Sequence, residues 1–119
     1  MPGAICTPLH ALAVAAVEVR LPEGGTVHLS YGEESIGEYL WQLAADHLIH
    51  GWDLTAATGQ DRAMDAELVD AVGAWFVGRE QLYRSGGAID ARPEFATGGS
   101  PSADLLISFG RDPAWTAPA

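Results

Sequence analysis

The stretch Tyr39-Leu-Trp-Gln-Leu-Ala-Ala-Asp-His-Leu-Ile-His-Gly-Trp-Asp-Leu54 decides the fold, because it places two of the four histidines inside a strongly helical pattern. His47 lies to one side of the main polar stripe of this helix. At about 100° per residue, that stripe carries Tyr39, Leu43, Asp46, His50 and Asp53. Polar groups that are buried together need a common partner, and a divalent metal is the simplest one.

Asp46 and His50 are the first candidate metal ligands. They are four residues apart, so a helix brings a carboxylate oxygen and an imidazole nitrogen to the same cation. The same spacing also fits an ordinary surface pair between an aspartate and a protonated histidine. Gly51 and Trp52 follow directly: the glycine lets another helix or a ligand approach, and the tryptophan needs burial with a partner for its N–H.

The block His50-Gly-Trp-Asp-Leu-Thr-Ala-Ala-Thr-Gly59, preceded by Asp46 and followed by Asp65-Ala-Glu-Leu-Val69, resembles a known family. This family comprises the actinobacterial metal-binding proteins related to mycothiol-dependent maleylpyruvate isomerase, within the wider DinB-like group. The resemblance extends to Thr26-Val-His-Leu-Ser-Tyr-Gly32 and to Leu105-Leu-Ile-Ser-Phe-Gly-Arg-Asp-Pro-Ala-Trp115. It covers the C-terminal part of the family's domain, so the family's N-terminal helices are expected to lie outside this chain.

The resemblance implies a helical bundle that holds a divalent metal between its helices, with zinc as the expected ion. Its acid-xxx-His pair matches Asp46 and His50, which become the expected metal ligands. Asp53 is the expected acceptor that orients an imidazole, and His47 is a possible extra ligand. The metal would activate a low-molecular-weight thiol for an isomerase or transferase reaction. The resemblance implies that the family's first metal histidine lies on an N-terminal helix that is expected to be missing from this chain.

Length and charge restrict the class of protein. A chain of 119 residues suits one domain, expected to span residues 1–119. Six basic and sixteen acidic residues give a formal charge of −10, which argues against nucleic acid and anionic membranes. The single Cys6 excludes an intrachain disulfide, and no apolar run reaches the roughly 20 residues that span a bilayer. We therefore expect a soluble, cytoplasmic protein.

The fold class expected from these patterns is mainly α, a partial DinB-like bundle with one short extended segment or hairpin, completed by dimerisation. Residues 17–21 and 26–31 also alternate as a β-hairpin would, which competes with the first helix, and residues 26–30 are extended in either case. His28 on this segment is expected to be exposed. The expected helices span about 8–19, 35–57 ended by Gly59, a third begun by Asp65, and 102–109 ended by Gly110.

The expected core joins the central helix to the helix after Asp65, and the short connection between them predicts antiparallel neighbours. The stripe of the later helix is Leu68, Val72, Trp75, Phe76 and Arg79. The facing side of the central helix is Ile36, Leu40, Leu43, His47 and Leu54. After Tyr83 the chain is expected to make a long Gly- and Pro-rich excursion, and Trp115 is expected to fold back on the body.

Two functions compete on this sequence. The favoured one is a metal-binding protein that activates a thiol, with Asp46 and His50 as ligands. The other is a non-catalytic remnant of the same family that acts as a dimeric binding or structural module. Both predict a homodimer, because a few helices of this length leave an apolar face uncovered. No GxSxG, phosphate-loop, dinucleotide-binding or HExxH motif supports another chemistry.

Overall fold

The computed structural model describes residues 11–12, 14–16, 18, 22, 24–29 and 32–118. Its contacts divide the chain into two compact units, Met1–Gln42 and Leu43–Ala119. The described residues are mainly helical, as the sequence predicts, and include one two-stranded antiparallel sheet. None of the described helices combines the length and apolarity that crossing a bilayer requires.

The first unit contains the hairpin of β1 (Thr26–Leu29) and β2 (Gly32–Ser35), in which Leu29 pairs with Gly32. The predicted extension of residues 26–29 is confirmed, and His28 is exposed as expected. The strand that pairs with β1 is β2. Of the alternative partner segment 17–21 only residue 18 is described, and it is helical; the rest lies outside the described residues. Only two residues separate β1 from β2, and the entropy lost in closing a loop rises with its length. This hairpin therefore forms at a low entropic cost.

The predicted first helix is supported where the structure describes it. Residues 11–12, 14–16 and 18 are helical, whereas the rest of the predicted range 8–19 lies outside the described residues. His10 and Cys6 lie there too.

The long helix α2 spans Ile36–Thr58, one residue later at each end than predicted. Ser35 caps it, because its Oγ accepts a hydrogen bond from the Glu38 backbone N at 3.1 Å. The Ile36 backbone N donates to the Gly25 carbonyl at 3.1 Å, which ties the hairpin to the first turn. Gly59 ends the helix with φ at 70°, the left-handed conformation that glycine adopts without a Cβ penalty.

Three further helices belong to the second unit: α3 (Ala66–Phe76), α4 (Glu80–Ser85) and α5 (Pro101–Ser108). The predicted cap of α3 is confirmed, since Asp65 Oδ1 accepts from the Leu68 backbone N at 3.0 Å. Ser100 caps α5 in the same way, through the Ala103 backbone N at 3.1 Å. The predicted excursion is confirmed for residues 86–100, which contain no helix or strand.

The core of the second unit joins α2, α3 and the α5 region. It comprises Ala45, Ile49, Trp52, Ala56, Val69, Val72, Trp75, Phe76, Leu105, Leu106 and Phe109. The predicted burial of Val72, Trp75 and Phe76 is confirmed, whereas Leu68 is half exposed. Phe76 stacks on Phe109 with ring centroids 4.0 Å apart, and Arg79 lies over the Trp75 ring instead of entering the core.

The predicted core face of α2 is wrong. The buried face is Ala45, Ile49, Trp52 and Ala56, whereas Leu54 is 63% exposed and His47 is exposed. At about 100° per residue, Leu43, His47 and Leu54 lie on the side of the helix opposite Ala45. Helix α2 thus has apolar residues on two sides, and the rest of the second unit covers the side that carries Ile49 and Trp52.

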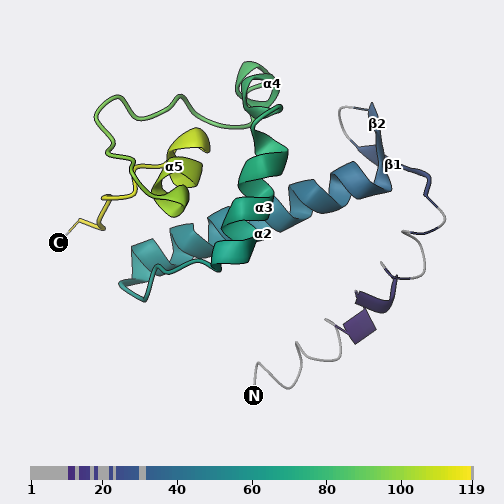
Figure 1. The fold of residues 1–119 in the computed structure, drawn as a ribbon, viewed down its shortest axis with the longest axis horizontal. Coiled ribbons are helices and arrows are strands. Elements are labelled where there is room, and N and C mark those ends of the chain that lie inside the picture. The colour runs from purple at the N-terminus through teal and green to yellow at the C-terminus, as the bar shows by residue number, and fades with distance from the viewer. Residues whose placement is uncertain are drawn as a thin grey trace. The chain divides into compact units, whose positions relative to one another are not determined.

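The predicted antiparallel arrangement is also wrong, because α3 crosses α2 at a steep angle (Figure 1). A steep crossing buries only part of each helix, and on α2 the buried residues lie within about three turns, from Ala45 to Ala56. The connection of residues 59–65 is short in sequence, but it does not require the second helix to fold back along the first.

Candidate functional site

The polar stripe of α2 lies on the surface. Asp46, His47 and His50 are all exposed, and they line a shallow hollow of about 420 Å³ together with Gly51 and Leu54. The expectation that this stripe is buried is wrong, because the buried face of α2 is the one that carries Ile49 and Trp52. The helix does bring Asp46 and His50 to the same hollow, as their spacing predicts.

Asp53 has a different partner from the one expected. Its carboxylate accepts two hydrogen bonds from the Arg111 guanidinium, at 2.6 Å and 3.0 Å. This hydrogen bonding raises the pKa of Arg111, and the charges of Asp53, Asp90 and Asp46 add to the effect. The partner of Asp53 in the structure is therefore a guanidinium, and the pair ties the segment after α5 to α2.

The imidazole of His47 is oriented by its own helix. Its Nδ1 lies 2.8 Å from the carbonyl oxygen of Leu43, one turn earlier. A carbonyl only accepts hydrogen bonds, so Nδ1 is the protonated nitrogen and Nε2 is left as the nitrogen that can bind a ligand. A backbone carbonyl that fixes the tautomer in this way is a common support of metal-binding histidines.

The described residues fit half of a metal site. Asp46 and His50 make no hydrogen bond or ion pair with other described residues, so both are available as ligands. Nowhere in the part of the chain that the structure describes do three His, Cys, Asp or Glu side chains come close enough to hold one ion. Zinc in proteins normally takes three or four protein ligands, so one chain supplies at most part of such a set here.

An apolar hollow of about 500 Å³ lies between α2 and the segment that leads into α3. The contributing side chains of α2 are Leu43, Ala44, His47, Leu48, Trp52 and Thr55, together with the backbone of Gly51. The other wall consists of residues 62–65 and Leu68. Arg62 stands over the Trp52 ring, with its guanidinium carbon 5.7 Å from the ring centroid.

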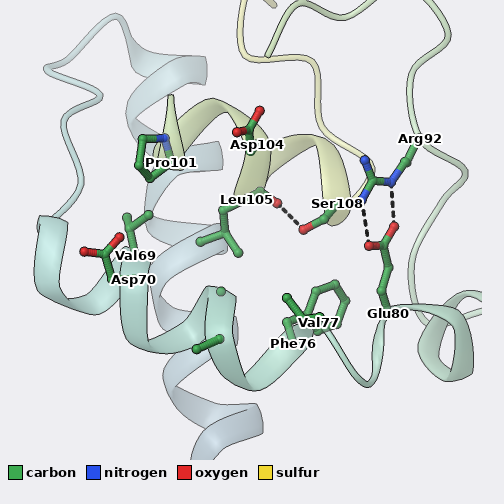
Figure 2. A pocket seen from close by; sticks show the side chains of 12 residues that line it. Val69, Asp70, Phe76, Val77, Glu80, Arg92, Pro101, Asp104, Leu105 and Ser108 are labelled. Atoms are coloured by element: carbon green, nitrogen blue, oxygen red, sulfur yellow. Dashed lines mark hydrogen bonds and ion pairs between the residues drawn. The ribbon is translucent and has the colours of Figure 1, made fainter. Parts of the chain in front are cut away.

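Another hollow, of about 290 Å³, lies between α3 and α5 (Figure 2). Arg92 reaches Glu80 at its edge through two hydrogen bonds of 2.6 Å and 2.7 Å, and Arg84 adds a third of 2.6 Å. These hydrogen bonds, that from Arg92 first, lower the pKa of Glu80 to about 2. The cluster fixes the 86–100 excursion to α4, which gives it a structural role.

The pairs Arg92–Glu80 and Arg111–Asp53 could not be predicted from local sequence patterns, since 12 and 58 residues separate their members. The predicted return of Trp115 is supported in part. Its carbonyl oxygen accepts a hydrogen bond from Arg62, and the residue is 44% exposed.

No protein-family model, curated protein or solved structure matches the chain. The family resemblance therefore stays a prediction.

Proposed function

We propose that the protein binds a divalent metal ion, with zinc as the expected ion, through Asp46 and His50 of α2. The observation that carries the proposal is that both side chains are exposed, share one hollow and make no hydrogen bond with other described residues. Their i, i+4 spacing on a continuous helix suits a carboxylate and an imidazole on one cation. His47 lines the same hollow, but within one chain it does not come close enough to join Asp46 and His50 on one ion.

The site is proposed to be completed by a second copy of the chain. The face of α2 opposite the core carries Leu43 and Leu54, and Leu54 lies at the edge of the same hollow as Asp46 and His50. No heavy atom lies within 4 Å of the position that a Cβ on Gly51 would take, so a partner helix can approach there. Two copies related by a two-fold axis would bring two aspartates and two histidines together, which matches the four ligands of zinc.

The reaction class proposed for this site follows from the sequence resemblance, namely activation of a low-molecular-weight thiol for isomerase or transferase chemistry. A zinc ion supplies positive charge that favours a thiolate over a thiol. The exposed position of Asp46 and His50 supports access for a small thiol. Asp53 remains bound to Arg111 in this proposal, so its carboxylate supports the end of α2 and does not reach the ion.

The dependence of dimerisation on Zn²⁺ tests the shared metal site. Sedimentation equilibrium at micromolar protein, with and without Zn²⁺, should show a dimer that the metal strengthens, because ligands that span an interface couple binding to assembly. His50→Ala should remove the effect of Zn²⁺, and His28→Ala, an exposed histidine of β1, should leave it unchanged. A folded wild-type monomer at every Zn²⁺ concentration would contradict the shared site.

A second candidate is a non-catalytic dimeric binding or structural module. It is favoured by the absence of a third ligand among the described residues. The two candidates differ in how cobalt-substituted protein responds to a small thiol. A thiol-to-cobalt charge-transfer band supports thiol activation, whereas a dimer that forms equally well without metal and gives no such band supports the module.

A further inference from the structure

The apolar hollow between α2 and the start of α3 has the size and lining of a small-molecule site. Its volume of about 500 Å³ lies within the usual range for ligand pockets, roughly 300–1,000 Å³. Leu48 and Met64, which are partly buried, join its lining to the core, whereas Leu68 is 49% exposed at its edge. The hollow thus presents apolar surface that remains in contact with water.

Arg62 gives this hollow one positive charge. Arg84, Arg92 and Arg111 each form an ion pair with a carboxylate. Arg62 forms none with the carboxylates that the structure describes: its contacts are the Trp115 carbonyl and the face of the Trp52 ring. A guanidinium carries five N–H donors, and Arg62 uses one of them in its hydrogen bond with a described residue, so it keeps donors for a ligand.

We propose that this hollow binds a small organic anion. Its apolar or aromatic body would lie against Leu48, Trp52 and Leu68, and its carboxylate or sulfonate would pair with Arg62. The attraction must come from Arg62 itself, because the chain as a whole has a formal charge of −10 and repels anions. Asp65 also lines the hollow, but its carboxylate accepts the hydrogen bond that caps α3.

The proposal does not depend on the metal site, since it uses neither Asp46 nor His50. His47 lines both hollows. Its Nε2 can contact the anion when no metal holds it. Failure of zinc binding would therefore leave the anion proposal standing, and failure of anion binding would leave the metal proposal standing.

A series of three probes with the same apolar body tests the charge preference. 3-Phenylpropionate, 3-phenylpropanol and 3-phenylpropylamine are titrated into the full chain, and the indole N–H signal of Trp52 is followed by NMR. The expected order of affinity is carboxylate, then alcohol, then amine, with about a fivefold gain for the carboxylate over the alcohol from a partly exposed charged hydrogen bond. The net charge of the protein alone predicts the reverse order.

Two arginine variants then test whether Arg62 causes the preference for the carboxylate. Arg62→Gln should lower carboxylate affinity about fivefold and leave alcohol affinity unchanged, which would show that the hollow itself persists. Arg92→Gln changes the net charge equally but lies outside this hollow, so it should alter neither affinity. Equal affinity for all three probes, a preference for the amine, or an unchanged carboxylate affinity in Arg62→Gln would each overturn the proposal.

Discussion

Glu80 is expected to stabilise the fold through a charge that acid removes. It accepts hydrogen bonds from Arg92 and Arg84, and its pKa falls from 4.5 to about 2. At about 1.4 kcal/mol per pKa unit, this fall corresponds to an upper value of about 3.5 kcal/mol. The Arg92 side chain is 54% exposed, so solvent screens the pair and we expect about 1–2 kcal/mol.

The sign of the pH dependence follows from the lowered pKa. In the unfolded chain Glu80 titrates near 4.5, so its contribution is complete above about pH 5 and is lost as the pH falls towards 2. Glu80→Gln should therefore lower the free energy of unfolding by about 1–2 kcal/mol at pH 7 and by roughly half as much or less at pH 3.

Urea denaturation followed by far-UV circular dichroism at the two pH values measures this difference. Glu94→Gln is the matched control, because it removes the same charge from the exposed 86–100 excursion. An equal loss for Glu80→Gln at pH 7 and pH 3, or an equal loss for both variants at pH 7, would refute the reasoning.

Three further predictions concern the helices. Trp75→Ala should cost about 3–5 kcal/mol in chemical denaturation, because the ring is buried in the aromatic core, and a loss below about 1 kcal/mol would show that it is not core. Gly51→Ala should raise the free energy of unfolding of the monomer by up to about 1 kcal/mol, because alanine favours the helix and has room there. Gly59→Ala should lower it, because Gly59 has a positive φ. A lower melting temperature for Gly51→Ala than for Gly59→Ala would contradict both expectations. Asp65→Ala should cost about 1 kcal/mol and Asp65→Asn only a few tenths, since asparagine also caps helices, and equal losses would exclude the capping role.

The ends of the helices could be predicted because they are encoded locally. A hydroxyl or carboxylate cap at Ser35 or Asp65, and a left-handed glycine at position 59, each act on backbone groups within a few residues. The predicted last helix at 102–109 likewise lies within one residue of α5 at both ends.

The buried face of α2 could not be predicted because the helix has two apolar sides. Leu43 and Leu54 made one side look like the core, whereas Ile49 and Trp52 with two alanines form the actual one. The difference depends on the steep crossing of α3, a tertiary property that periodicity does not encode. Strand β2 was missed because its sequence Gly-Glu-Glu-Ser has no alternating apolar residues.

The candidate site was predictable only in its local part. Spacing placed Asp46 and His50 at one hollow, as found, since both belong to one helix. The pairing of Asp53 with Arg111 and the placement of Arg62 over Trp52 depend on loops that return to α2, so no local pattern indicated them.

Titration calorimetry of the metal-free protein with Zn²⁺ tests the central proposal most directly. The wild type and His28→Ala should bind Zn²⁺ with the same affinity, Asp46→Ala should bind much more weakly, and His50→Ala should show no binding. Equal Zn²⁺ binding by the wild type and His50→Ala would contradict the metal site on α2.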